Sequence, residues 1–399
     1  MTPSDARAWL NRNVLGMGAT SLLSDASHEA TTAVLPGFLA VLGLPPIALG
    51  IIEGVSDAAS SFVKLGSGWL GDRTGRRWEL AVGGYAVTGA MPLLLALAGS
   101  WPVVLVAKTV GWIGRGIRGP VRDAILAESV PPEARGRAFG FHRAGDTIGA
   151  VIGPALAVVV LGSVASSVAD PQAVFREVFL LALIPGVAAA VIFALFVSDP
   201  AVGVREVAPP DASSRGLTPE FRRFLAGVGL FGVGDFAPTL LILAATTLLA
   251  PRLGVVGAGA TAGVLYVIRN IVYAAGSYPI GAASDRFGRP LLLLAAGYLV
   301  GAGVAVGTVM AFALGVSEPI YLGLLFVGSG ILAAVQDTLE AVATASLAGA
   351  ARRATAFGVL GTVNGLGDLV ASAGVGLVWT LASPVLAFAR RRRPCSQGR

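Results

Sequence analysis

Charged residues are scarce in this chain of 399 amino acids, and cysteine is almost absent. Charged side chains make up 13% of the residues, about half the usual share, whereas apolar residues make up 55%. A chain of this composition has too few polar side chains to cover its surface in water. Cys395 is the single cysteine, which excludes a secreted scaffold held by disulfides. The apolar content also excludes a disordered tail protein.

Lysine is nearly missing as well, although the formal net charge is +6. The two lysines, Lys64 and Lys108, both lie in apolar stretches, so no lysine-rich stripe indicates a nucleic-acid partner. The sequence has no cysteine cluster or His-Glu-x-x-His pattern for a metal, and no phosphate-binding loop for ATP. It also shows no nucleophile–base pair typical of an enzyme. We therefore expect no catalytic residue, no cofactor, no resident metal and no nucleic-acid partner.

Long apolar runs dominate the chain instead. Each is about 20 residues or longer, the length that crosses a bilayer as a helix, whereas the strands of a membrane barrel are shorter and alternate. The sequence therefore predicts an all-α polytopic membrane protein with eleven spans. Their approximate bounds are 14–41, 46–70, 79–98, 102–127, 138–163, 176–197, 222–249, 260–283, 290–313, 319–346 and 355–382.

The arginines outside these spans predict the orientation, because cytoplasmic loops carry an excess of Lys and Arg. With the N-terminus in the cytoplasm, fifteen arginines fall in cytoplasmic segments, and only Arg176 and Arg252 fall in external loops. The N-terminus has no cleavable signal pattern, so we expect the first helix to act as its own insertion signal. These features indicate a multi-pass protein of the bacterial cytoplasmic (inner) membrane.

A stretch rich in proline and serine separates the sixth and seventh spans, which is typical of a linker. We predict an N-terminal six-helix bundle over 1–197, a cytoplasmic linker over 198–218, a C-terminal bundle with five clear helices over 219–389, and a basic tail over 390–399.

The end of the chain conflicts with this topology. Four arginines, Arg390 to Arg393, follow the eleventh span after a stretch too short to cross a bilayer. Eleven spans would place these arginines outside the cell, against the bias of all the others. A last helix that is missing or truncated would explain the conflict, and a short external basic tail is the alternative.

Two segments of the first half of the chain recur in the second half. Residues 68–77 (GWLGDRTGRR) follow the second span, and residues 281–290 (GAASDRFGRP) follow the eighth span, 213 positions later. Residues 134–140 and 351–358 open the fifth and eleventh spans, about 217 positions apart. One shift explains both pairs, which indicates two pseudo-symmetric halves with a site between them.

The segment 68–77 resembles the signature loop of the major facilitator superfamily, G-x-x-x-D-R-x-G-R-R, and carries it whole. The resemblance implies the major facilitator fold, with two pseudo-symmetric six-helix bundles and transport by alternating access. It also implies a cytoplasmic gate locked by Asp72 and Arg73, with Glu128 as an acidic partner. The alternative is that these arginines only enforce orientation. The expected gating residues are Gly68, Asp72, Arg73, Gly75, Arg76, Glu128, Asp285 and Arg286.

Two partial motifs of the same superfamily concern proton coupling. Residues 115–119 resemble the R-x-x-Q-G of many proton-coupled members, with Arg118 in place of Gln. Residues 149–154 match the first half of the G-x-x-x-G-P-x-x-G-G of drug-exporting antiporters, but Ala157 and Val158 stand where the closing glycines would be. These matches favour proton-coupled export, and the missing glycines weaken that interpretation.

The charges inside the spans predict a polar cavity. The third, sixth and ninth spans carry no interior charge, whereas the other eight do. Because a charge inside a bilayer is costly, it usually faces a cavity or another charge. The residues expected at the substrate and proton cavity are Asp25, His28, Glu29, Glu53, Asp57, Lys64, Lys108, Arg115, Arg118, Arg122, His142, Arg143, Asp146, Asp235, Arg269, Asp337 and Asp368.

Two interpretations of these charges stay open. In the first, carboxylates such as Asp25, Glu29, Glu53 and Asp57 take up and release a proton, since burial favours their neutral form and a nearby cation their charged form. In the second, the six acids and six bases of the first half only neutralise one another. The two histidines could likewise be proton carriers or simply hydrogen-bonded.

Three arginines of the fourth span, Arg115, Arg118 and Arg122, share one face. A guanidinium stays charged when buried and binds carboxylate or phosphate through two hydrogen bonds, which favours an anionic or zwitterionic substrate. The alternative is that they only hold Asp123 and the acids of the second span.

The sequence thus predicts a secondary active transporter, driven by the proton gradient, that exports a small organic molecule. Uptake of an organic anion with protons is an alternative, and so is a non-transporting receptor or scaffold on the same fold. The expected partners are the substrate, protons and the lipid bilayer, and we expect a monomer.

Overall fold

The computed structural model describes residues 9–42, 46–164, 170–200, 217–232, 234 and 238–381, and within them the chain is helical, with no strand. The helices are α1 (Arg12–Val41), α2 (Pro46–Thr74), α3 (Arg77–Ala96), α4 (Trp101–Glu128), α5 (Arg135–Val164), α6 (Pro171–Phe196), α7 (Pro219–Gly232), α8 (Pro238–Phe287), α9 (Pro290–Leu314), α10 (Pro319–Leu347) and α11 (Arg353–Leu381). Single 3₁₀ turns at Pro132–Ala134 and Ala350–Arg352 precede α5 and α11.

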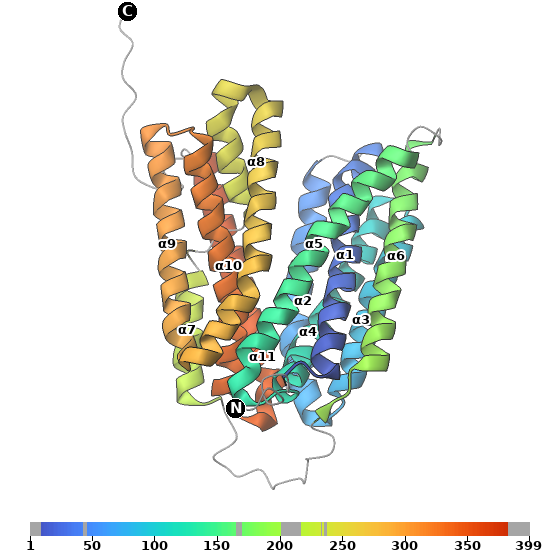
Figure 1. The fold of residues 1–399 in the computed structure, drawn as a ribbon. Helices are drawn as coiled ribbons and strands as arrows, with labels where there is room; N and C mark the ends of the chain where they lie inside the picture. Colours follow the sequence, from blue (N-terminus) through green and yellow to red (C-terminus); the bar gives the residue numbers. More distant parts are fainter. Residues whose placement is uncertain are drawn as a thin grey trace, which may run out of the picture.

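Two groups of helices stand side by side (Figure 1). We call α1 to α6 the N-terminal bundle and α7 to α11 the C-terminal bundle. The main contacts between them are α5 with α8 and α2 with α11. The bundles meet at the end where α1 begins, and their ribbons diverge toward the other end (Figure 1). We call the meeting end the closed end, which comprises residues 68–77, 128–140, 277–285 and 345–358.

An apolar cluster joins the two bundles at the closed end. It contains Ile125 and Phe139 of the N-terminal bundle together with Val342 and Phe357 of the C-terminal bundle. The rings of Phe139 and Phe357 lie with their centroids 5.8 Å apart. Because burial of apolar surface is favourable in proportion to its area, this cluster stabilises the arrangement in which the closed end is shut.

Among the described residues, six helices are long and apolar enough to cross a membrane, namely α3, α5, α6, α9, α10 and α11. α1, α2 and α4 have a comparable length, with 30, 29 and 28 residues. Ionisable side chains in their interiors lower their apolar character, as at Asp25, Asp57 and Arg115. The helices that combine sufficient length with interior charge are those expected to face a polar cavity.

The structure places the break between α7 and α8 differently from the sequence prediction. The predicted spans 222–249 and 260–283 are replaced by a short α7 and a helix α8 of 50 residues. Pro238 opens α8, because the first turn of a helix does not need the missing N–H of proline. A straight helix of this length would measure about 75 Å. Figure 1 shows instead that α8 turns back at the end remote from the closed end, so that its two arms lie side by side.

Candidate functional site

Asp72, in the last turn of α2, connects the two bundles at the closed end. Its carboxylate accepts hydrogen bonds from the backbone N–H of Thr355 at 2.6 Å, from the Thr355 hydroxyl at 2.7 Å and from the N–H of Ala354 at 3.3 Å. These N–H groups belong to the first turn of α11, where the helix dipole favours a negative charge. A carboxylate of the N-terminal bundle therefore caps a helix of the C-terminal bundle.

Arg77, the first residue of α3, is the buried cation beside Asp72. Its guanidinium pairs with Asp72 at 2.6 Å and with Glu128 at 2.9 Å. Glu128, the last residue of α4, also pairs with Arg353 of α11 at 3.0 Å. The four side chains form one network that joins three helices of the N-terminal bundle to α11. Because Arg77 is fully buried, loss of either carboxylate would leave the network with one positive charge in excess, which is costly away from water.

Asp285, in the last turn of α8, makes the equivalent contact in the opposite direction. Its carboxylate accepts hydrogen bonds from the backbone N–H of Gly136 at 2.7 Å and of Arg137 at 2.9 Å, in the first turn of α5. It also pairs with the Arg137 side chain at 3.0 Å. Asp285 follows Asp72 by 213 positions, so the internal repeat relates the two carboxylates. Each one caps a helix of the other bundle.

Glycine allows the two backbones to approach at these contacts. A methyl group added at Gly281 would overlap the carbonyl oxygen of Gly136, and one added at Gly68 would overlap the carbonyl oxygen of Ala354. Both glycines lie four residues before the capping aspartates, one helical turn away. The repeat therefore places a small residue and an aspartate together on each side of the closed end.

The predicted pair of Asp72 with Arg73 does not form. Arg73 is exposed, and its guanidinium lies over the ring of Trp69 at 5.0 Å. Gly75 has a φ of 70°, a left-handed conformation that reverses the chain after α2 and brings Arg77 back to Asp72. The other predicted gating arginines are also exposed, namely Arg76 and Arg286.

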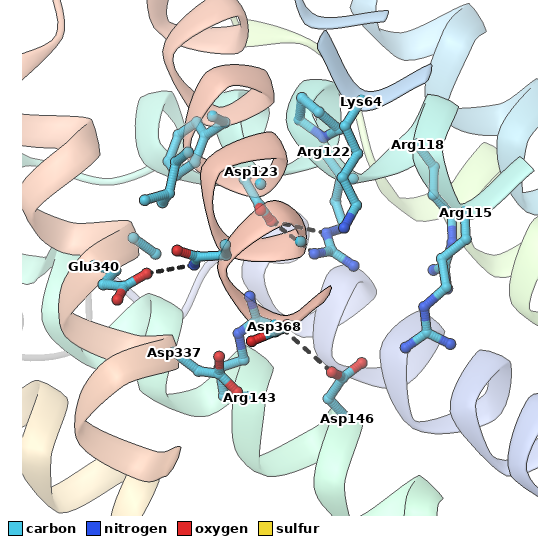
Figure 2. Close-up of a pocket in the computed structure, with 18 residues that line it drawn as sticks. Lys64, Arg115, Arg118, Arg122, Asp123, Arg143, Asp146, Asp337, Glu340 and Asp368 are labelled. Atoms are coloured by element: carbon cyan, nitrogen blue, oxygen red, sulfur yellow. Dashed lines mark hydrogen bonds and ion pairs between the residues drawn. The ribbon is translucent and has the colours of Figure 1, made fainter. Parts of the chain in front are cut away.

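A cavity of about 300 Å³ lies between the bundles, and Figure 2 shows the side chains around it. The lining comes from α2, α4, α5, α10 and α11. None of the lining residues belongs to α3, α6 or α9, the helices whose interiors carry no charge. The charged residues that line the cavity are Lys64, Arg115, Arg118, Arg122, Asp123, Arg143, Asp146, Asp337, Glu340 and Asp368.

Most charges of the N-terminal bundle are paired within that bundle. The pairs are Arg115–Asp25 at 3.1 Å, Arg122–Asp123 at 2.8 Å, Arg143–Asp146 at 3.4 Å and Lys108–Glu53 at 3.2 Å. Paired and buried, these groups can remain charged in the membrane. The pairing favours the interpretation in which many of them neutralise one another.

Arg118 is paired less well than its neighbours. The residue is 1% exposed and its guanidinium lies over the ring of Tyr85 at 4.1 Å. Its ion pair with Asp25 is long, at 4.0 Å, and Asp25 is shared with Arg115. Among the described residues, Nε and Nη1 of Arg118 and Nη1 of Arg115 have no hydrogen-bond partner. Each buried donor without a partner costs about 1–3 kcal/mol, so acceptor oxygens of a ligand would be favoured here.

The C-terminal bundle contributes carboxylates to the described lining of the cavity, and no cation. Glu340 accepts hydrogen bonds from the Tyr298 hydroxyl and from the Asn364 amide, both at 2.6 Å. Asp337 accepts a hydrogen bond from the Tyr273 hydroxyl. Figure 2 shows Glu340 and Asp337 on the opposite side of the view from Arg115 and Arg118. The described lining therefore has five cations and two carboxylates from the N-terminal bundle, and only carboxylates among the charged residues of the C-terminal bundle.

Comparison with known proteins gives the family of this chain. The family model of the Major Facilitator Superfamily matches residues 17–372. The chain belongs to this superfamily. An uncharacterized MFS-type transporter of Methanocaldococcus jannaschii is 30% identical over 389 residues, which cover 95% of this chain and 91% of that protein.

Solved structures of other major facilitator proteins share the fold. The human organic anion transporter MFSD10 superposes with a TM-score of 0.67 at 16% identity, over 94% of this chain and 95% of that one. The proton:xylose symporter XylE superposes with a TM-score of 0.65 at 16% identity, over 96% of this chain and 92% of that one. At such identities the likeness shows the fold alone. With the family match, it makes this chain a multi-pass membrane transporter.

Several residues predicted for the cavity of this major facilitator protein do not line it. His28 is buried, with its ring edge-on to Trp112 at a centroid distance of 4.8 Å. Lys108 pairs with Glu53 and donates a hydrogen bond to Thr32 at 3.1 Å. Three other acids of α1 and α2 are also not among the lining residues, namely Asp25, which pairs with Arg115, the half-buried Glu29 and the exposed Asp57.

Three further predicted residues lie elsewhere in the chain. His142 is fully buried in α5, and among the described residues neither ring nitrogen has a hydrogen-bond partner. Arg269 of α8 donates hydrogen bonds to Ser329 at 3.0 Å and to Asn270 at 2.9 Å. Asp235 lies outside the described residues.

Four residues of the site had no assigned partner in the sequence prediction, namely Arg77, Arg353, Thr355 and Tyr273. Arg77 ends the signature segment, and Arg353 and Thr355 belong to its repeat-related partner segment 351–358. The position of Arg77, Arg353 and Thr355 in these repeated segments is the sequence feature that could have identified them. Tyr273 sits in an apolar run of α8 and carries no pattern of its own.

Proposed function

We propose that this major facilitator protein carries a small organic molecule with a negatively charged group into the bacterial cytoplasm together with a proton. The substrate binds in the cavity between the bundles, and the bundles rock about it. The protein works as a monomer in the inner membrane with its N-terminus in the cytoplasm. With this orientation the closed end is cytoplasmic, and the structure corresponds to an outward-facing state.

The observation that carries this proposal is the position of Arg118 and Arg115 in the cavity. Their unpaired N–H groups are buried donors with a permanent positive charge. A carboxylate, phosphate or phosphonate offers acceptor oxygens in the geometry that a guanidinium matches.

Asp25 supports co-transport with a proton. Among the described residues, it is the one carboxylate that forms ion pairs with both Arg115 and Arg118, at 3.1 Å and 4.0 Å. An anionic group that binds these arginines places a second negative charge beside Asp25, which favours the protonated form of Asp25. By linkage, the proton in turn favours binding of the anion. Anion and proton therefore bind together, as symport requires.

Export in exchange for protons is the second candidate function. It is favoured by the partial antiporter motif in α5, where Gly149 and Gly153 pack against the backbone of α1 at Leu22 and Ala26. A substrate exported in exchange for protons would have to carry a positive charge and bind near Asp25. Otherwise it would have to bind at a place away from Asp25.

Proteoliposomes that contain a pH-sensitive dye test the proposal. Small carboxylates and phosphonates are added outside, one at a time. Symport predicts that a transported anion acidifies the interior, whereas exchange for protons predicts that the interior becomes alkaline. Proton movement with lipophilic cations alone would overturn the proposed substrate charge, and substrate movement that is indifferent to pH would overturn proton coupling.

A further inference from the structure

Arg118 and Arg122 are buried arginines of α4, one helical turn apart, and their charges are balanced in different ways. Arg122 is held by a carboxylate, since its Nε donates a hydrogen bond to Asp123 at 2.9 Å and its Nη2 pairs with the same oxygen at 2.8 Å. Arg118 lies instead with its guanidinium over the ring of Tyr85, 4.1 Å from the ring centroid. The carboxylate takes up an N–H group of Arg122, whereas Nε and Nη1 of Arg118 have no partner among the described residues.

Tyr85 reaches Arg118 because α3 and α4 approach closely at this level. A methyl group added at Gly84 would overlap the backbone N of Arg118 and the carbonyl oxygen of Gly114. Tyr85 is 1% exposed, and its ring lies 4.9 Å from the ring of Phe193 on α6. The ring is therefore fixed by packing. α3 contributes no side chain to the described lining of the cavity, yet Tyr85 contacts an arginine that does.

The ring supplies a compensation that the nearest carboxylate gives only weakly. Asp25 lies 3.1 Å from Arg115 but 4.0 Å from Arg118. A cation over an aromatic face is attracted by the negative face of the ring, and the attraction is stronger away from water. Such a face does not occupy the edge of a guanidinium that binds the two oxygens of a carboxylate. The charge of Arg118 is thus stabilised while its donors stay available.

Without this ring, Asp25 would take the place of Tyr85 as the main partner of Arg118. The present separation of 4.0 Å is longer than the usual 2.7–2.9 Å of a charged hydrogen bond. A guanidinium released from the ring would close this gap and use its N–H groups on Asp25. An incoming anion would then have to displace Asp25, whereas in the present arrangement the donors are preorganised for it.

We propose that Tyr85 is a positioning residue for the substrate: its ring holds the guanidinium of Arg118 away from Asp25, so that Nε and Nη1 of Arg118 bind the anionic group. This inference rests on the proposed function and adds a residue of α3 to its binding site. Tyr85 acts through Arg118 and does not itself contact the substrate.

Calorimetry on the purified protein tests the inference. A panel of linear carboxylates and phosphonates with two to six carbon atoms first identifies an anion that binds to the wild type. Tyr85→Leu should bind this anion about tenfold more weakly, the scale of one charged hydrogen bond. Tyr85→Phe should keep the wild-type affinity, since the ring remains and the Tyr85 hydroxyl has no hydrogen-bond partner among the described residues. If Tyr85→Leu does not fold, Tyr85→Met serves in its place, because methionine adapts to core gaps without an aromatic face.

Phe179→Leu is the control for the loss of a packed ring. Phe179 is a fully buried aromatic residue of the same bundle, and its ring lies edge-on to Phe38 at 5.2 Å. Its replacement should lower the midpoint of thermal unfolding, as the loss of buried atoms does. It should leave the affinity for the anion unchanged.

The Asp25→Asn background tests the cause. No carboxylate then competes for Arg118, so the effect of Tyr85→Leu on the affinity for the anion should shrink to about threefold or less. A double-mutant cycle measures this coupling between positions 85 and 25. A ring that only filled space would weaken binding by the same factor in both backgrounds.

The outcomes separate this inference from the proposed function. Equal affinity of Tyr85→Leu and the wild type overturns the role of Tyr85 and leaves the anion site in place. An equal loss in Tyr85→Phe and Tyr85→Leu, or an equal loss with and without Asp25→Asn, also overturns it. If no anion of the panel binds to the wild type, the proposed substrate charge is wrong, and the role of Tyr85 is wrong with it.

Discussion

The carboxylate of Asp72 accepts a hydrogen bond of 2.6 Å from the backbone N–H of Thr355, although the two residues lie on different bundles. The repeat supplies the same contact between Asp285 and Gly136 at 2.7 Å. Each contact is a charge-assisted hydrogen bond at a helix N-terminus, the place where a negative charge is most favoured. Opening of the closed end must break both hydrogen bonds. Their stability therefore sets the balance between the state in which the closed end is shut and the state in which it is open.

Arg77→Gln should open the closed end. Arg77 is fully buried between Asp72 and Glu128, and breaking a buried pair by removing one partner costs about 3–5 kcal/mol. The measurement is labelling of a cysteine at position 345, in a Cys395→Ser background, by a membrane-impermeant thiol reagent. Ala345 is fully buried at the closed end, so its labelling reports opening.

Arg73→Gln is the matched control for this prediction. Arg73 is an exposed arginine of the same segment, and its replacement should leave both the labelling and the transport rate unchanged. Equal effects of the two variants would show that closure of the closed end does not depend on the ion pairs of Arg77.

Gly281→Ala should destabilise the shut conformation. The added methyl group would overlap the carbonyl oxygen of Gly136, and overpacking of this kind typically costs about 1–3 kcal/mol. Gly303→Ala is the control, since nothing lies within 4 Å of a methyl group at this position of α9, and alanine is the better helix former. Thermal unfolding should show a lower midpoint for the first variant and an equal or higher one for the second. A lower midpoint for both would contradict the role of close approach.

Asp25→Asn should uncouple transport from the proton gradient. Asp25 is the carboxylate that faces both Arg115 and Arg118, and its replacement removes the titratable group while the arginines remain. In proteoliposomes, an imposed pH gradient should no longer drive accumulation of the anion, whereas exchange of substrate for substrate should persist. Glu79→Gln, an exposed acid in the first turn of α3, should behave like the wild type.

The other acids of α1 and α2 give the comparison for this prediction. Among the described residues, Glu29, Glu53 and Asp57 form no ion pair with Arg115 or Arg118, whereas Asp25 pairs with both, so neutralisation of the other three acids should have a smaller effect on coupling. If all four variants keep the wild-type dependence on pH, the proton site lies elsewhere, and Asp146 becomes the next candidate.

The orientation can be read from two single cysteines. Thr74, the last residue of α2, and Gly99, between α3 and α4, are both exposed and lie on opposite sides of one predicted span. In whole cells that lack Cys395, an impermeant reagent should label the cysteine at position 99 directly. It should label the cysteine at position 74 only after permeabilisation. The reverse pattern would place the N-terminus outside.

Features that depend on local sequence were predictable. Apolar length fixes where helices cross the membrane, and the all-helical major facilitator fold follows from it together with the segment 68–77 and its copy at 281–290. The absence of interior charge in α3, α6 and α9 also separated them from the helices that line the cavity, because the cost of a charge in lipid acts on each helix by itself.

Features that depend on partners were decided by the tertiary structure. The sequence paired Asp72 with its neighbour Arg73, whereas the turn at Gly75 and the packing of α11 give it Arg77 and Thr355. It likewise predicted one continuous span over 222–249, whereas α7 ends at Gly232 and α8 begins at Pro238. The polarity of the cavity arises only when Arg118 of one bundle and Asp337 of the other line the same space. Adjacent residues in a helix point in different directions, so distance along the chain does not tell which charges meet.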